Sequence, residues 1–243
     1  MKVVATLQSP ITKGELKNYG KFVKDYEDNE RVVRCRNKNV LRKKAVISKE
    51  EFWRCLVIAM LTTQTKSGEH SPLHVFLKTK PNILNYNYVI GIEDKENIER
   101  EIPENVTRFW NKTCLYIREA ISAFKQDFWC DVEKQLKSIE SDTTLEKERA
   151  VADFIRKHFK GIGRKQSRNI IQMMGLSKYV LPIDSRVMKK IKELSGLSLK
   201  ESLEKNYLLI EDRLQEICKS IGVYPCIFDA CAFCSQETTK KED

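Results

Sequence analysis

The sequence contains little glycine and little proline, the two residues that most often interrupt regular structure. Its 243 residues include nine glycines and six prolines. Few turn signals, together with many Lys, Glu, Leu and Ile residues, favour helices joined by short loops. No segment alternates apolar and polar residues as a half-buried strand does. We therefore expect an all-α protein.

Long apolar runs are also missing. No window approaches the roughly 20 apolar residues that a membrane helix needs, and the first residues have only a brief apolar run before they turn polar. We expect a soluble, intracellular protein without a membrane partner, located in the cytoplasm and nucleoid or in a nucleus. The eight cysteines of such a chain should be mostly reduced.

Acidic residues are outnumbered by basic ones, 34 to 44, which gives a net charge of +10 and a pI near 9.1. This balance suits a polyanionic partner, nucleic acid first and an anionic membrane surface second. Charge by itself is weak evidence, because runs of charge are usually solvated faces. A more specific signal has to come from motifs.

The chain is long enough to bury a core without disulfides. We expect one domain over residues 1–235, with a helical core at 46–184 that carries the motifs described below. The segments 1–45 and 185–235 are expected to pack together. Residues 236–243 are polar and are expected to form a disordered tail.

Local signals predict several helix boundaries. A capping-box pattern begins at Ser48, Gly175 stands where a C-terminal glycine belongs, and Asp184 stands where an N-cap belongs. The stretch 104–129 has apolar residues at helical spacing and predicts a helix. The segment 11–46 predicts a helix followed by a basic connection.

A short connection, KGIGRK, joins two predicted helices. Gly161 and Gly163 are free to take positive φ, which a tight interhelical turn often requires, and they let another backbone come close. The N–H groups at the start of the second helix form an anion site, for which a DNA phosphate is the natural ligand. Four basic residues surround this site: Lys160, Arg164, Lys165 and Arg168. A plain turn with a solvated basic face is the alternative.

The stretch FKGIGRKQSRNII…VLPIDSRV resembles the hairpin and catalytic loop of the helix-hairpin-helix DNA glycosylases. In bifunctional members, a Gly-apolar-Gly-x-Lys hairpin carries a nucleophilic lysine, and an aspartate follows in an apolar-Pro-apolar-Asp segment. Lys165 and Asp184 match both positions, and their separation, 184 − 165 = 19, fits the 8-oxoguanine branch. The resemblance covers roughly 48–235 and implies two helical subdomains with the hairpin at about 150–175.

This resemblance implies base-excision repair of double-stranded DNA by a monomer that removes an oxidised base, 8-oxoguanine first. Lys165 is implied to form a Schiff base at C1′ and to act as an AP lyase, and Asp184 to stabilise the sugar cation. Gln64 matches the residue that fills the gap left by the flipped base. Asn169 and Phe228 are candidates for the border of the base pocket, with core packing as the alternative for Phe228.

Both catalytic candidates have a structural alternative. Asp184 fits a simple N-cap, which is compatible with catalysis, and Lys165 fits one more phosphate-binding lysine. A free lysine has a pKa of about 10.4 and is almost fully protonated at pH 7. The site has to lower that pKa, which desolvation, a helix N-terminus and neighbouring arginines all favour.

The C-terminal cysteines do not match an iron–sulfur cluster. Endonuclease III-like members carry the spacing C-x6-C-x2-C-x5-C, whereas this chain has C-x7-C-x4-C-x2-C from Cys218 to Cys234. We interpret Cys226, Cys231 and Cys234 as small apolar residues of a helix. We therefore expect no metal and no cofactor, with a monovalent cation at the hairpin left open.

Three other functions remain open at this point. The first is an endonuclease III-like glycosylase for oxidised pyrimidines. The second is a helix-hairpin-helix protein that binds DNA without catalysis, and the third is a zinc-stabilised module built on the C-terminal cysteines.

Overall fold

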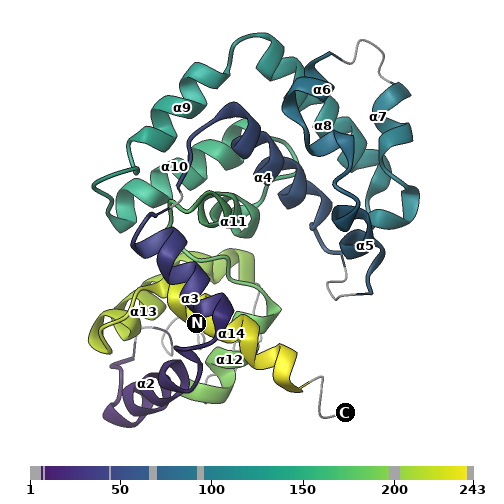
Figure 1. Ribbon diagram of the computed structural model, residues 1–243. Helices are drawn as coiled ribbons and strands as arrows, with labels where there is room; N and C mark the ends of the chain where they lie inside the picture. Colours follow the sequence, from purple (N-terminus) through teal and green to yellow (C-terminus); the bar gives the residue numbers. More distant parts are fainter. Residues whose placement is uncertain are drawn as a thin grey trace. The chain divides into compact units, whose positions relative to one another are not determined.

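The structure is a computed structural model, and it describes most of the chain (Figure 1). The described residues are 7, 9–43, 45–65, 70–91, 96–196 and 203–239. They form helices and connecting turns, with no strand among them. The predicted all-α fold is therefore confirmed.

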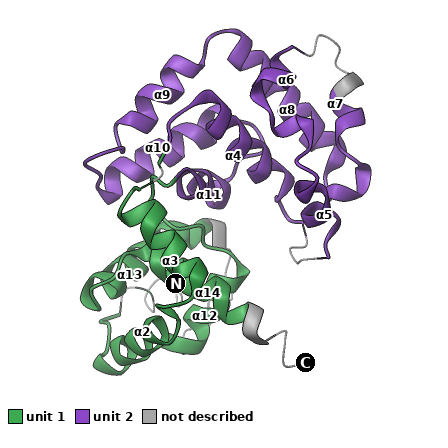
Figure 2. Ribbon diagram, in the orientation of Figure 1, with its two compact units in different colours: residues 1–45, 175–243 green, residues 46–174 purple. Residues whose placement is uncertain are grey.

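The chain divides into two compact units, coloured separately in Figure 2. Unit 1 consists of Met1–Ala45 and Gly175–Asp243, and unit 2 of Val46–Met174. The helices of unit 1 are α2 (Lys13–Tyr26), α3 (Glu30–Cys35), α12 (Ser185–Ser195), α13 (Leu203–Ser220) and α14 (Pro225–Thr239). Those of unit 2 are α4 (Lys49–Leu61), α5 (Pro72–Lys78), α6 (Tyr86–Ile90), α7 (Glu96–Glu101), α8 (Trp110–Lys125), α9 (Trp129–Lys137), α10 (Leu145–His158) and α11 (Arg164–Met174).

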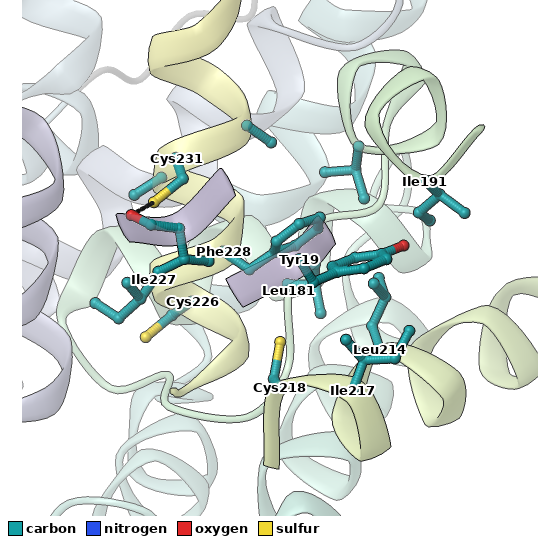
Figure 3. Packing of buried hydrophobic residues seen from close by; sticks show 14 of the residues in the cluster. Tyr19, Leu181, Ile191, Leu214, Ile217, Cys218, Cys226, Ile227, Phe228 and Cys231 are labelled. Carbon is teal, nitrogen blue, oxygen red and sulfur yellow. Dashed lines mark hydrogen bonds between the residues drawn. The ribbon is translucent and has the colours of Figure 1, made fainter. Parts of the chain in front are cut away.

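The core of unit 1 joins elements from both ends of the chain (Figure 3). Phe228 on α14 is 0% exposed, and its ring centroid lies 5.4 Å from that of Tyr19 and 5.8 Å from that of Phe22, both on α2. The ring is enclosed by its own unit, which favours core packing, the alternative given for Phe228. Its place beside a base pocket stays a prediction.

The clustered cysteines belong to the same core. Cys226, Cys231 and Cys234 are buried on α14, as their interpretation as apolar residues predicted. Burial raises the pKa of Cys231 to about 12, and it also raises the pKa of Cys218 on α13. The thiols of Cys218 and Cys231 therefore stay protonated at neutral pH, and the buried cysteines of α14 act as packing groups.

A buried ion pair ties the N-terminal segment of unit 1 to α13. Arg213 donates from Nη2 to both carboxylate oxygens of Glu15, at 3.0 and 2.9 Å. Its Nη1 donates to the carbonyls of Leu7 and Ser9, at 3.1 and 2.8 Å. The two charged side chains are only 6% and 7% exposed. A single guanidinium therefore joins segments about 200 residues apart in the sequence.

Aromatic rings form the core of unit 2. Phe52 on α4 lies 5.5 Å from Phe159 and 6.1 Å from Phe124, measured between ring centroids. Trp53 is fully buried, and its indole N–H donates to the carbonyl of Ile83 at 2.9 Å. The large side chains of α4 thus fill the centre of the unit and fix the helix on which the candidate site is built.

Helix boundaries agree with the local cap signals. The hydroxyl of Ser48 accepts a hydrogen bond from the N–H of Glu51 at 3.1 Å, and α4 begins there. Gly175 has φ +82 and follows directly on the end of α11. Asp184 caps α12.

Three sequence predictions of local structure are wrong. The stretch 104–129 is not one helix, because Asp127 adopts φ +61 and ends α8 before α9 begins. The basic connection after α2 is itself helical, as α3 and a π-helical turn at Arg36–Val40. Helix α14 continues to Thr239, past the expected start of a tail at residue 236, and residues 240–243 lie outside the described residues.

Among the residues that the structure describes, no single helix is long and apolar enough to cross a bilayer. The segments Lys205–Ser220 and Pro225–Gln236 meet the criteria of length and composition only together, as a pair bent by 98°.

We predict that the Glu15–Arg213 pair stabilises unit 1. Replacing Arg213 with Ala leaves a buried carboxylate without its partner, which should cost about 3–5 kcal/mol of unfolding free energy. The matched control is Arg34→Ala, which breaks the exposed pair with Glu30 and should cost less than about 1 kcal/mol. Urea denaturation measures both, and equal midpoints for the two variants would contradict the prediction.

Candidate functional site

The hairpin between α10 and α11 is short and anchored on both sides. The N–H of Phe159 donates to the carbonyl of Ile155 at 3.0 Å, and that of Ile162 donates to the carbonyl of Phe159 at 3.3 Å. Phe159 and Ile162 are 2% and 5% exposed. Their burial holds the turn against the core of unit 2, so the helix-hairpin-helix motif lies where the sequence predicted it.

Only one of the two hairpin glycines is required by the turn. Gly161 has φ +81, and a Cβ at this position would lie 2.4 Å from Cδ2 of Tyr116 on α8. Gly163 does not have a positive φ, and a Cβ there would meet no atom within 4 Å. Gly163 is exposed, so its open side is accessible to a ligand.

The basic residues of the hairpin differ in how far their side chains are exposed. Lys160 is exposed and pairs with Glu119 at 2.9 Å, a hydrogen bond that raises the pKa of the lysine. Arg164 and Lys165 are half-buried in the first turn of α11. At this helix end the dipole disfavours a cation.

Arg168 does not fit its predicted contact with DNA. Its side chain is 0% exposed, and Nη1 donates to the carbonyl of Arg164 at 3.3 Å. Helix α11 is buried around most of its circumference, so a position that the sequence suggests is solvated lies inside. Asn169 on the next position is half-buried, and its place in a base pocket stays a prediction.

Gln64 is exposed and lies in a turn at the end of α4, whose threonines are half-buried. The turn begins at Thr62, and Gln64 itself has φ +52. The hydroxyls of Thr62 and Thr63 both donate to the carbonyl of Ala59 at 3.1 Å, and that of Thr65 donates to the carbonyl of Leu61 at 3.0 Å. These bonds satisfy carbonyls that the helix leaves open. The last residues of the matching segment, Lys66 and Ser67, lie outside the described residues.

A small pocket lies beside the hairpin in unit 2. It has a volume of about 160 Å³, and its lining includes Met60, Thr63, Tyr116 and Gly161. The ring of Tyr116 therefore contacts the required glycine and also forms a wall of this pocket. Among the described residues, no group of three or more His, Cys, Asp or Glu side chains could hold a metal ion.

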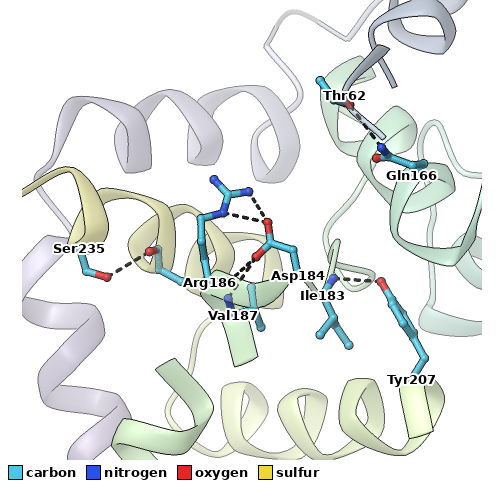
Figure 4. A network of polar contacts seen from close by, with 9 residues as sticks. Thr62, Gln166, Ile183, Asp184, Arg186, Val187, Tyr207 and Ser235 are labelled. Carbon is cyan, nitrogen blue, oxygen red and sulfur yellow. Dashed lines mark hydrogen bonds and ion pairs between the residues drawn. The ribbon is translucent and has the colours of Figure 1, made fainter. Parts of the chain in front are cut away.

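Asp184 is held by several donors at the start of α12 (Figure 4). Its Oδ1 accepts hydrogen bonds from the N–H groups of Arg186 and Val187, at 2.9 and 3.2 Å. Its Oδ2 accepts the side chain of Arg186, from Nε at 2.8 Å and from Nη2. The carboxylate is 14% exposed. These charge-assisted bonds favour its ionised form and fix its orientation.

Two contacts around Asp184 were not predicted from the sequence. The hydroxyl of Tyr207 on α13 donates to the carbonyl of Leu181 at 3.0 Å and accepts the N–H of Ile183 at 3.0 Å, as Figure 4 shows in part. These two hydrogen bonds hold the extended segment before Asp184 in place. The guanidinium of Arg186 lies 4.3 Å from the ring centroid of Phe233 on α14. Neither contact has a signal in the local sequence, because each partner comes from a distant helix.

Comparison with known proteins identifies a family. Residues 33–223 match the family model Ogg-HhH, described as 8-oxoguanine DNA glycosylase. A search of curated proteins gives no significant match. The matched residues include the hairpin, Lys165 and Asp184.

Solved structures of 8-oxoguanine DNA glycosylases from two organisms have a similar fold. The 8-oxoguanine DNA glycosylase of Methanocaldococcus jannaschii is 18% identical over 90% of this chain and 91% of that chain, with a TM-score of 0.63. The enzyme of Thermotoga maritima is 16% identical over 90% and 95%, with a TM-score of 0.64. The M. jannaschii glycosylase/lyase bound to a 15mer DNA containing 8-oxoguanine is 18% identical over 88% and 94%, with a TM-score of 0.62.

We predict that Gly161→Ala destabilises unit 2 and that Gly163→Ala does not. The first variant combines a left-handed backbone with a contact against the Tyr116 ring, at a cost of about 1–3 kcal/mol. The second adds a methyl group in open space and should change stability by less than about 1 kcal/mol. Thermal and urea denaturation compare the two, and equal destabilisation would show that the turn does not depend on Gly161.

Proposed function

Because the chain belongs to the 8-oxoguanine DNA glycosylase family, we propose that it excises 8-oxoguanine from double-stranded DNA and then cleaves the strand as an AP lyase. The family match carries this proposal, since it covers both the hairpin with Lys165 and the segment with Asp184. It favours the 8-oxoguanine branch over an enzyme for oxidised pyrimidines.

We propose that the hairpin binds the phosphate backbone of the DNA. Gly163 leaves open space beside the N-terminus of α11, and a helix N-terminus attracts phosphate. Lys160 and Arg164 add positive charge at the same end. Gln64, exposed after the end of α4, fills the gap that the extruded base leaves in the duplex.

Asp184 and Lys165 have different roles in the proposed reaction. As the N-glycosidic bond breaks, its electron pair leaves with the base and positive charge develops on the sugar, which the ionised Asp184 stabilises. The released base takes up a proton from solvent. The neutral Nζ of Lys165 forms a bond to C1′; the C1′–O4′ bond then breaks with its electron pair staying on O4′, which takes up a proton from the nitrogen, and a protonated imine remains. A C2′ proton passes to solvent, its electron pair forms the C2′–C3′ double bond, and the 3′ phosphate leaves with the electron pair of the C3′–O bond, so the strand is cleaved by elimination and not by hydrolysis.

We predict that borohydride traps this imine on a duplex containing 8-oxoguanine and that Lys165→Gln abolishes the trapped complex. The reagent adds hydride to the imine and leaves a stable amine that gel electrophoresis detects. Lys137→Gln is the matched control, because Lys137 is an exposed lysine of the same unit that pairs with Glu133 on α9. This control should trap as the wild type does.

Other outcomes separate the alternative functions. An adduct on thymine glycol and not on 8-oxoguanine would assign the substrate to the oxidised pyrimidines. Base release without any adduct would remove the lyase and leave a monofunctional glycosylase. Tight, salt-sensitive DNA binding with neither product would leave a protein that only binds DNA.

We predict that Asp184→Asn separates the charge of this residue from its capping role. Asparagine still accepts the N–H bonds at the start of α12 but loses the bonds that Oδ2 accepts from Arg186, so stability should fall by about 1–3 kcal/mol, less than for Asp184→Ala. Loss of the negative charge should lower the single-turnover rate of 8-oxoguanine release by about 10²–10³-fold. Asp184→Ala removes both roles and should also lower stability. If the Asp184→Asn variant released 8-oxoguanine at the wild-type rate, Asp184 would have no role beyond capping α12.

A further inference from the structure

A buried glutamine joins the lysine helix to the end of α4. Gln166 directly follows Lys165 in the first turn of α11 and is 5% exposed. Its Nε2 donates to Oγ1 of Thr62 at 3.3 Å and to Oγ1 of Thr63 at 3.1 Å, and Figure 4 shows the first of these bonds. The three residues all belong to unit 2.

The direction of these hydrogen bonds follows from the threonines. Each hydroxyl gives its single proton to the carbonyl of Ala59, so only its lone pairs are left for another partner. The side-chain amide of Gln166 has two N–H donors, one for each hydroxyl. This arrangement fixes the orientation of the amide, and Oε1 is left buried without a hydrogen-bond partner. A carboxylate of the same shape accepts only and cannot replace it.

The two threonines form the first half of the turn that presents Gln64. Gln64 follows Thr63 directly, is exposed, and has the left-handed φ of +52. Gln166 therefore connects the residue proposed to enter the duplex with the turn of helix that carries the proposed nucleophile. A buried side chain that keeps one of its polar atoms without a partner is costly for stability alone, which favours a role beyond packing.

We propose that Gln166 is a positioning residue that holds the Gln64 turn in a fixed place relative to Lys165. Insertion of Gln64 and attack on C1′ then take place in one geometry when the lesion is extruded. This inference rests on the proposed function and deepens it. Gln166 does not touch the substrate, and it acts only through Thr62 and Thr63.

The test compares two duplexes, one with 8-oxoguanine and one with an abasic site, using the variant Gln166→Glu. The first duplex requires a base to be unstacked and the second does not. A misplaced Gln64 should lower the single-turnover rate on 8-oxoguanine by about tenfold to a hundredfold. Borohydride trapping on the abasic duplex, which reports Lys165 itself, should stay close to the wild-type rate.

Three further variants complete the design. Gln172→Glu makes the same substitution on the same helix, and it should match the wild type on both duplexes. The double variant Thr62→Val with Thr63→Val removes the acceptors while keeping the shape of the side chains. It should reproduce the selective loss, and adding Gln166→Glu to it should cause no further loss, because the two changes break one contact.

The outcomes distinguish this inference from the proposed function. Wild-type rates of Gln166→Glu on both duplexes would overturn the positioning role and leave the proposed function intact. Equal losses on both duplexes, with the same pattern in the threonine variant, would also overturn it, because the residue would then support Lys165 or the fold. If the wild-type protein excised no 8-oxoguanine, the proposed function itself would be wrong, whatever the variants showed.

Discussion

The backbone at Gly161 is the constraint on which the candidate site depends. Its φ of +81 and the Tyr116 ring beside it leave no room for a side chain. Buried Phe159 and Ile162 hold the turn on either side. Because the connection is so short, this one turn decides where α11 begins. It therefore places Lys165 in the first turn of that helix and Gln166 in contact with the end of α4.

The two proposed catalytic side chains are fixed by separate means, each within its own unit. Lys165 depends on the hairpin and on the aromatic core that supports it. Asp184 depends on the cap of α12, on the bonds from Arg186, and on the Tyr207 hydroxyl that clamps the preceding segment. Local contacts thus fix the proposed nucleophile and its proposed charged partner independently. The net charge of +10 favours approach to a polyanion and does not determine which base is removed.

Local chemistry explains what the sequence could predict. The caps at Ser48 and Asp184 and the end of α11 at Gly175 depend on residues within a few positions of one another. The hairpin was recognisable because a glycine-rich turn and a following lysine are adjacent in the chain. Helix-forming composition was enough for the fold class.

Contacts between distant residues explain what the sequence could not predict. Gln166 meets Thr62 and Thr63 across more than 100 positions, and nothing in its neighbourhood indicates that it donates to them. Arg168 looks solvated in the sequence, but the packing of α11 buries it. The ring of Phe228 looks available for stacking until the core of unit 1 encloses it.

The most direct test of this account is to locate the covalent bond itself. The complex trapped by borohydride on an 8-oxoguanine duplex can be digested with protease and nuclease, and mass spectrometry then finds the peptide that carries the reduced sugar. We predict a single modified residue, Lys165, in the peptide that spans the start of α11. A sugar attached to another lysine or to the N-terminal amine would contradict it.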